Sequence, residues 1–437
     1  MAGLGLVQTA AILLGLLLAF LAGGLWIGLA LIAVGFAAML IATDAPVGTV
    51  LATSVWSSSA SWALAALPLF IWMGEILFRT RLSEQMFKGL APWLNWLPGR
   101  LLHVNVVGCG IFAAVSGSSA ATCATIGKIA LPELKRRGYD DSMSLGSLAG
   151  SGTLGLLIPP SIPMVVYAVA ANVSILQVFI AGFLPGLLVM ALYSGYIVAW
   201  SLANPARVPP PDPAMSLGEK LRQSAQIIPC LLLILFIFMS LILGWATATE
   251  CAAFGVLGAL ALAAWSRTLT WSTFVESVMA ATRLTGMIML ILAGAAFTTA
   301  AMAYTGIPAA LASFVEQQRL SPYVLIAALT VMYIILGCLI DGISMIVLTT
   351  VVVLPMIKQA GFDLVWFGVY LIILVEMAQI TPPVGFNLFV LQNMSGKDSF
   401  AVARAAFPFF LLLVVAVVIV TAFPSIALVL PKLAFPD

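Results

Sequence analysis

Long apolar stretches recur along almost the whole chain, and they limit its possible folds more than any other feature. They cover about residues 7–22, 25–43, 61–78, 103–132, 143–171, 177–201, 226–244, 248–266, 284–303, 322–357, 364–390 and 405–430. A helix that crosses a bilayer needs roughly 20 apolar residues. Only 8% of the residues are charged, whereas soluble domains carry roughly 25%. The sequence therefore predicts an all-α polytopic membrane protein and excludes a soluble enzyme and a nucleic-acid-binding protein.

The two halves of the chain resemble each other when the numbering is shifted by 223 residues. This shift aligns, without a gap, Pro132 with Pro355, Gly138 with Gly361, and Pro159-Pro160 with Pro382-Pro383. Internal duplications in transporters often have inverted topology. We therefore predict a first inverted repeat over residues 1–202, a cytoplasmic connector over 203–225 and a second inverted repeat over 226–437.

Each half contains one apolar stretch that is too long for a single ordinary span. Residues 103–132 and 322–357 are interrupted near their middle by small polar residues, at about 115–122 and 339–344. Backbone that leaves the helix at membrane depth is tolerated only where it is buried in protein or lines a cavity. We therefore predict two re-entrant helical hairpins whose tips meet near the midplane. The following helices, at about 143–171 and 364–390, should each be broken at a Pro-Pro pair.

The distribution of basic residues predicts the orientation of the hairpins. Lysine and arginine accumulate in cytoplasmic loops. Placing Lys135, Arg136 and Arg137 in the cytoplasm puts most of the other basic residues on the same side and the N-terminus outside. The two hairpins then open to opposite faces of the membrane, as an inverted repeat requires.

The hairpin tips and the helix breaks supply candidate ligands for an anion and a cation. Half-helix N-termini attract anions, and carbonyls freed by proline can bind a hard cation such as Na⁺. The candidate substrate ligands are Ser118, Ser119, Thr122, Pro160, Ser161, Asp341, Gly342, Ser344 and Pro383. The candidate Na⁺ ligands are Ser116, Ser119, Gly155, Ile158, Pro159, Gly337, Ala378 and Thr381. No arginine is expected at this depth, so we expect helix dipoles, hydroxyls and bound Na⁺ to recognise the anion.

The acidic residues within the apolar stretches have competing interpretations. Asp341 either serves the transport site or forms a structural helix cap, and the sequence favours neither. Glu75, Glu250 and Glu376 are expected to be buried, hydrogen-bonded structural residues or interfacial groups. An intramembrane hydrolase would need a base near a serine nucleophile. The sole histidine, His103, lies about 20 Å from Ser116 along a helix, which excludes that reading.

Several motifs resemble the large membrane subunit of the tripartite ATP-independent periplasmic (TRAP) transporters, the DctM type. They are ALPLFIWMGE at 66–75, SGSSAAT at 116–122, LPEL at 131–134, RGYD at 137–140, IPPS at 158–161, FLPG at 183–186, TATE at 247–250 and EMAQITPPVG at 376–385. The resemblance that these motifs carry extends over nearly the whole chain.

The resemblance implies an elevator-type transporter with a fold like that of the ion transporter superfamily. It implies Na⁺-driven import of an organic acid, such as a C4-dicarboxylate, a sugar acid like sialic acid, or a keto acid. An extracytoplasmic binding protein would deliver the substrate, and a small four-helix membrane subunit would be a separate chain. The implied location is the bacterial or archaeal cytoplasmic (inner) membrane, with no cofactor besides the coupling Na⁺ and no enzymatic activity. A stand-alone sodium-coupled divalent-anion carrier remains the alternative.

Overall fold

The computed structural model describes residues 5–80, 82–211, 215–225, 227–317, 321–383 and 385–435. All regular structure within these ranges is helical, which confirms the all-α prediction. By length and composition, five of these helices could cross a membrane, or up to seven if each bent pair forms one span. The short and broken helices account for most of the remaining apolar stretches.

The first part of the chain forms a series of mostly apolar helices before the predicted hairpin. They are α1 (Leu6–Ala22), α2 (Ile27–Ala42), α3 (Val47–Ser59), the 3₁₀ turn η1 (Trp62–Ala65), α4 (Ala66–Phe78) and α5 (Leu82–Leu94). The apolar pattern did not predict α3, because seven of its 13 residues are glycine, serine or threonine. None of its residues is buried.

The first hairpin and the first broken helix lie where the sequence predicts them. The hairpin consists of α6 (Leu102–Ser116) and α7 (Ser119–Arg136). Gly117 ends α6 in the left-handed conformation, with φ of 57°, which glycine adopts at little cost. The broken helix consists of α8 (Asp141–Leu157) and α9 (Ile162–Ala171), which are bent by 42°. A long helix, α10 (Ile175–Ala203), follows.

The connector and the next helices differ from the prediction in one important place. They are η2 (Pro205–Arg207), α11 (Leu217–Ser224), α12 (Ile228–Ile242), α13 (Ala248–Trp265), α14 (Trp271–Thr305) and α15 (Ile307–Gln317). The predicted stretch at 284–303 is only the second part of α14, which has 35 residues. The hydroxyl of Thr270 accepts a hydrogen bond from the Thr273 amide and so caps the helix well before the apolar stretch begins.

The second hairpin consists of α16 (Pro322–Gly337) and α17 (Gly342–Gln359), and the second broken helix of α18 (Leu364–Gln379) and α19 (Phe386–Ser395). The last predicted stretch, 405–430, is not one helix. It is divided at Phe423 and Pro424 into α20 (Ser399–Ala422) and α21 (Ser425–Ala434). Proline interrupts helical hydrogen bonding, and here it begins a second, shorter helix.

The helix bounds repeat at the offset found in the sequence. Ser119 and Gly342, which begin α7 and α17, are 223 residues apart, as are Arg136 and Gln359, which end them. Asp140 and Asp363, which are also 223 residues apart, cap α8 and α18 through their carboxylates. This coincidence supports the repeat hypothesis, and the division of the chain at the connector stays a prediction.

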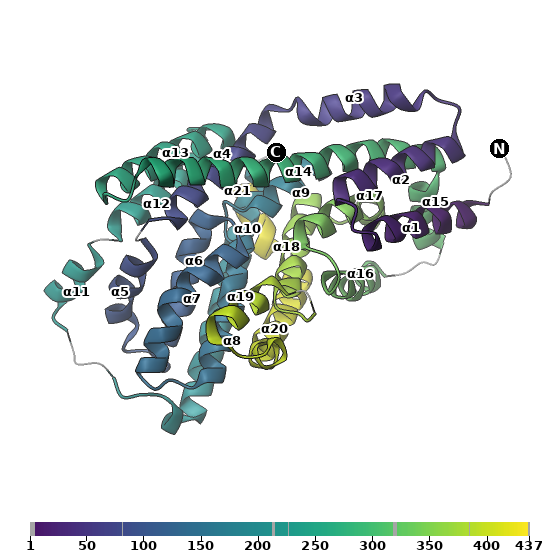
Figure 1. Ribbon diagram of the computed structural model, residues 1–437. Helices are drawn as coiled ribbons and strands as arrows, with labels where there is room; N and C mark the ends of the chain where they lie inside the picture. Colours follow the sequence, from purple (N-terminus) through teal and green to yellow (C-terminus); the bar gives the residue numbers. More distant parts are fainter. Residues whose placement is uncertain are drawn as a thin grey trace.

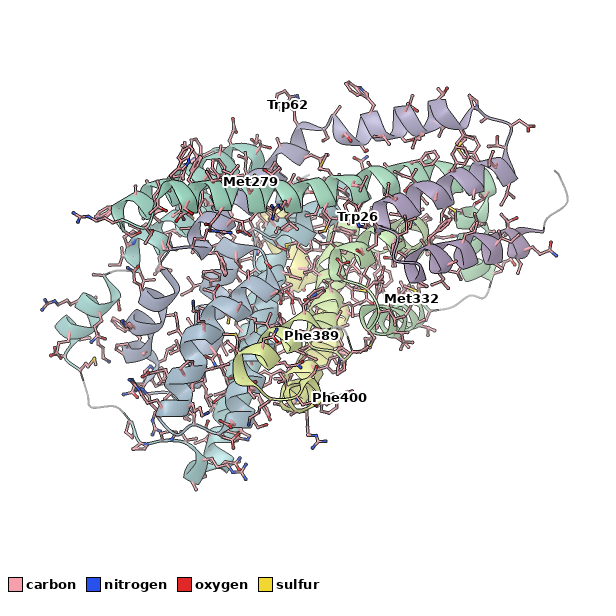
Figure 2. The ribbon with its side chains drawn as sticks, viewed as in Figure 1. Trp26, Trp62, Met279, Met332, Phe389 and Phe400 are labelled. Carbon is pink, nitrogen blue, oxygen red and sulfur yellow. The ribbon has the colours of Figure 1, made fainter. Side chains whose placement is uncertain are left out.

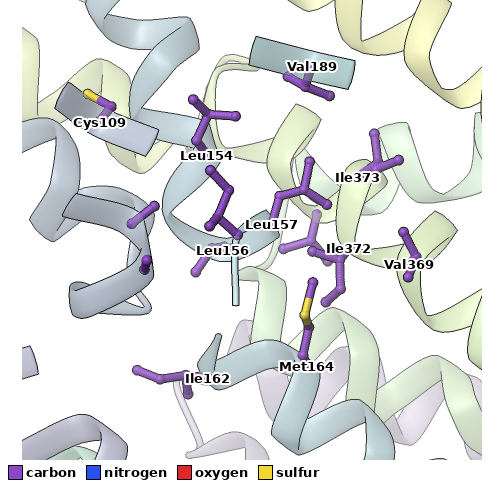
Figure 3. Close-up of a cluster of buried hydrophobic side chains, with 14 of the residues drawn as sticks. Cys109, Leu154, Leu156, Leu157, Ile162, Met164, Val189, Val369, Ile372 and Ile373 are labelled. Atoms are coloured by element: carbon purple, nitrogen blue, oxygen red, sulfur yellow. The ribbon is translucent and has the colours of Figure 1, made fainter. Parts of the chain in front are cut away.

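The two broken helices pack against each other at the centre of the molecule. Figure 3 shows Leu154 and Leu157 of α8 beside Ile372 and Ile373 of α18, and all four side chains are fully buried. In Figure 1, α6, α7 and α8 stand beside α18 and α20, while α14 crosses above them with α2 and α3 alongside. Figure 2 shows Trp62 and Phe400 pointing outward, with 89% and 71% of each residue exposed. The hairpins are thus held in a central group, and α14 extends across it.

Candidate functional site

The two hairpin tips face one cavity of about 970 Å³. Residues 117–120 and 341–344 line it, together with part of α14, the start of α2 and the end of α18. Both tips therefore border a common cavity, and their meeting near the membrane midplane stays a prediction. Five of the predicted substrate ligands are in its wall: Ser118, Ser119, Asp341, Gly342 and Ser344.

The other predicted substrate ligands lie outside the cavity wall. The Thr122 side chain is fully buried, and its hydroxyl is 2.6 Å from the Ser116 hydroxyl. At the break of the first broken helix, Ile162 and Pro163 line the cavity where Pro160 and Ser161 were expected. The Ser161 hydroxyl is buried and has no hydrogen-bond partner among the described residues. Pro383 is exposed away from this cavity.

The first tip is tied to other helices through Ser119, which is 2% exposed. The Ser119 hydroxyl lies 2.9 Å from the Gly152 carbonyl oxygen and 3.4 Å from a carboxylate oxygen of Glu376. The amide nitrogen of Asn387 donates to the Ser119 hydroxyl at 3.0 Å. Glu376 is fully buried and also accepts a hydrogen bond of 2.7 Å from the Leu156 amide. The interpretation of Glu376 as a buried structural residue therefore agrees with its contacts.

The second tip is held mainly by its own helix cap. One carboxylate oxygen of Asp341 accepts hydrogen bonds from the amides of Ile343 and Ser344, at 3.1 and 3.2 Å. The other oxygen accepts a hydrogen bond from the Ser344 hydroxyl. Both oxygens are thus used at the N-terminus of α17. These contacts favour the cap reading of Asp341, although its carboxylate still borders the cavity.

The predicted Na⁺ ligands lie close together in each half, and all of them are buried except Thr381, which is partly exposed. In the first, the Ser116 hydroxyl lies 3.3 Å from the Ser118 carbonyl oxygen, and a methyl group on Gly155 would come within 2.5 Å of that oxygen. Ile158 and Pro159 are buried at the adjacent break. In the second, a Cβ on Gly337 would lie 2.4 Å from Cβ of Ala378, whose carbonyl accepts a 3.3 Å hydrogen bond from the Thr381 amide. The structure thus brings members of each group near one another, and their role in binding Na⁺ stays a prediction.

An arginine also lines the cavity, although the sequence interpretation expected no guanidinium in the site. Arg283 comes from α14 and lines the cavity opposite the hairpins. Within the described ranges it forms no ion pair and no side-chain hydrogen bond. The sequence interpretation placed Arg283 at the end of a span because it began the helix at residue 284. Thr270 and Thr273 stand three residues apart before the apolar stretch. This pair is the sequence signal for a helix cap, and it would have placed the start of the helix before Arg283.

Gln379 is a second residue that the sequence interpretation did not select. It ends α18, is 7% exposed and lines the cavity. Its side chain has no hydrogen-bond partner among the residues described. The Gln379 amide and the Arg283 guanidinium, which line the same cavity, supply N–H donors from which a carboxylate can accept hydrogen bonds. Gln379 lies within the motif at 376–385, which is the only signal in the sequence that points to it.

Comparison with known proteins places the chain in a transporter family. The profile of the DctM component of tripartite ATP-independent periplasmic transporters matches residues 14–426. The C4-dicarboxylate TRAP transporter large permease protein of Pseudomonas aeruginosa is 33% identical over 87% of this chain and 89% of its own length. The ectoine/5-hydroxyectoine TRAP transporter large permease protein of Ruegeria pomeroyi is 29% identical over 85% of this chain and 87% of its own length.

A solved structure has the same kind of fold at low sequence identity. The YdaH transporter of Alcanivorax borkumensis superimposes with a TM-score of 0.62, covering 88% of this chain and 87% of its own, at 11% identity. That likeness concerns the fold alone. The family profile and the Pseudomonas relative both extend over most of the sequence. The chain therefore belongs to the DctM family, the large permease component of the tripartite ATP-independent periplasmic transporters.

Proposed function

We propose that this protein imports an organic acid together with Na⁺ across the cytoplasmic (inner) membrane of a bacterium or archaeon. The observation that carries the proposal is the cavity bordered by both hairpin tips and by Arg283, which has no ion-pair partner among the described residues. The relatives are named for C4-dicarboxylate, for ectoine and, in Haemophilus influenzae, for sialic acid. These compounds differ in size and net charge but share a carboxylate group.

The substrate carboxylate would bind between Arg283 and the N-terminus of α7. The positive end of a helix dipole favours an anion, and α7 begins at Ser118, whose side chain is neutral. The N-terminus of α17 carries the Asp341 carboxylate, which offsets its dipole. Asp341 would therefore face substrate hydroxyls or a bound cation rather than the substrate carboxylate.

The coupling ions would occupy the two buried groups of oxygens beside the hairpins, one in each half. The helices that carry both hairpins would move against the remaining helices in an elevator-type transition. An extracytoplasmic binding protein would deliver the substrate, and a small four-helix membrane subunit would form the complex with this chain. The family's tripartite composition supports both partners. If the purified chain transports without them, the alternative of a stand-alone sodium-coupled divalent-anion carrier applies.

Sodium coupling can be tested in proteoliposomes that contain the permease, its small subunit and its binding protein. Radiolabelled succinate, ectoine and N-acetylneuraminate would be supplied in turn, without ATP. We expect that uptake of at least one of them requires an inward Na⁺ gradient. Equal uptake after the gradient has been collapsed would contradict the proposal.

Arg283 can be tested by charge removal in the same assay. Losing a charge-assisted hydrogen bond costs about 1.5–3 kcal/mol, so Arg283→Gln should raise the half-saturation concentration roughly 10- to 150-fold. Arg283→Lys keeps the positive charge but not the planar guanidinium, so its half-saturation concentration should rise less than that of Arg283→Gln. Arg404→Gln, which removes an exposed charge from α20, is the matched control. If Arg283→Gln transports like the control, Arg283 does not bind the substrate.

A further inference from the structure

A second cavity, of about 1320 Å³, lies between α5, α7, α11 and the connector, away from the hairpin tips. The charged side chains in its wall are predominantly basic. They are Lys88, Arg136, Arg137, Lys220 and Arg222, against Glu133 and Glu219. The wall therefore carries an excess of three positive charges.

The two acidic residues offset only part of this positive charge, and α11 itself, with Glu219, Lys220 and Arg222, keeps a net charge of +1. Glu133 is paired with Arg136 and Arg137, at 2.7 and 2.6 Å. The Glu219 carboxylate accepts hydrogen bonds of 2.9 Å from both the amide and the hydroxyl of Ser216. These bonds hold the pKa of Glu219 below its usual value, so its charge stays at the start of α11.

The two basic residues of α11 have no acidic partner. Arg222 forms no ion pair within the described part of the chain, and Lys220 lies over the ring of Trp93 at 5.7 Å. Arginine and lysine without carboxylate partners are the usual ligands of phosphate groups. The cavity thus offers a phosphate two cations that form no ion pair with a carboxylate among the residues that the structure describes.

The rest of the wall is apolar and lies beside interfacial tryptophans. Ala91, Pro92, Ile129 and Met215 line the cavity together with Trp96, which is 78% exposed. Exposed tryptophans are typical of the region where lipid headgroups meet the acyl chains. A free inorganic phosphate would gain nothing from this apolar wall, whereas the glycerol and acyl parts of a phospholipid would be buried against it.

We propose that this cavity binds the phosphate headgroup of an anionic glycerophospholipid from the leaflet that it faces. The phosphate contacts Lys220 and Arg222 of α11, and the lipid's apolar part packs beside Trp96 and Ile129. Basic pockets between membrane helices on the cytoplasmic side bind such headgroups. Because α7 belongs to the first hairpin and α11 to the connector, the lipid joins the base of that hairpin to the segment between the two halves.

The test uses the full chain, purified with its small subunit, and native mass spectrometry with added lipid. The probes are 1-palmitoyl-2-oleoyl phosphatidylglycerol, tetraoleoyl cardiolipin and, as the neutral lipid, 1-palmitoyl-2-oleoyl phosphatidylcholine. We expect the two anionic lipids to be retained and the neutral lipid to be lost. Lys220→Gln with Arg222→Gln should weaken retention of the anionic lipids at least roughly tenfold. The matched control is Lys358→Gln with Arg404→Gln, which removes the same charges outside the cavity.

Two results would overturn the proposal. One is equal retention of the anionic lipids by the cavity variant and the control. The other is displacement of the lipids by inorganic phosphate at millimolar concentration, which would identify a free anion as the ligand. Lys220 and Arg222 lie on a short helix with no buried residue, so both variants should fold. Elution of both as the intact complex in gel filtration checks this, and the single variant Arg222→Gln gives a smaller loss in the same direction.

Discussion

The two hairpin tips occupy equivalent positions in the sequence but are held in different ways. Ser119 of the first tip is 2% exposed and bonded to groups on α8, α18 and α19. At the second tip Leu339 is 65% exposed, and the Asp341 carboxylate bonds only to residues of its own helix. The side-chain hydrogen bonds of Ser119 therefore reach other helices, whereas those of Asp341 stay within its own helix in the part of the chain that the structure describes.

The tips also differ in charge at the position that the repeat makes equivalent. Ser118 caps α7 with a neutral hydroxyl, whereas Asp341 caps α17 with a carboxylate. A helix N-terminus carries roughly half a positive charge. The first tip thus presents a positive end to the cavity, and the second presents a nearly neutralised one. A duplicated element can therefore supply two different surfaces to one site.

The largest expected difference concerns which side of the membrane each hairpin opens to. Lys135 and Lys358 are 223 residues apart and exposed near the ends of α7 and α17. Single cysteines at these positions would be introduced after replacement of the native Cys109, Cys123, Cys230, Cys251 and Cys338. A membrane-impermeant maleimide should label Lys135→Cys only from the cytoplasm and Lys358→Cys only from outside. Labelling of both from the same face would exclude inverted hairpins.

A smaller effect is expected from removing the tertiary support of the first tip. Glu376→Leu leaves the buried Leu156 amide without its acceptor, which should cost about 1–3 kcal/mol. Hydrogen exchange at residues 116–122 should rise more than at residues 339–345. Glu376→Gln keeps an acceptor oxygen and should therefore raise hydrogen exchange at residues 116–122 less than Glu376→Leu. Equal increases at both tips would show that they are not supported independently.

The smallest effect should come from the two caps. Asp341→Ala removes the acceptor of two amides and one hydroxyl and should cost about 1 kcal/mol, a roughly fivefold faster exchange in the first turn of α17. Ser118→Ala removes one bond of 3.4 Å to the Ala121 amide and should cost less. Asp341→Asn should cost much less stability than Asp341→Ala. If Ser118→Ala speeded hydrogen exchange more than Asp341→Ala, the prediction that Asp341 is the stronger cap would be wrong.

The sequence predicted which segments form the site better than it predicted the individual residues in the cavity wall. The small polar residues at 115–122 and 339–344 predicted both tips, and both border the cavity. Thr122 and Pro383 were selected by their nearness in sequence to a tip or a break, yet neither is in the cavity wall. Arg283 was overlooked because the apolar pattern alone could not reveal the capped polar start of α14.

Helix breaks and caps could be predicted from the sequence because they depend on residues within a few positions of each other. Gly117, Ser118 and Asp341 act on the backbone that they belong to. The partners of a buried polar group depend on packing instead. Ser119 and Glu376 are 257 residues apart, and only the folded structure brings them together. The same holds for Arg283, since the crossing of α14 over the hairpins follows from how the helices bury their surfaces rather than from any local pattern.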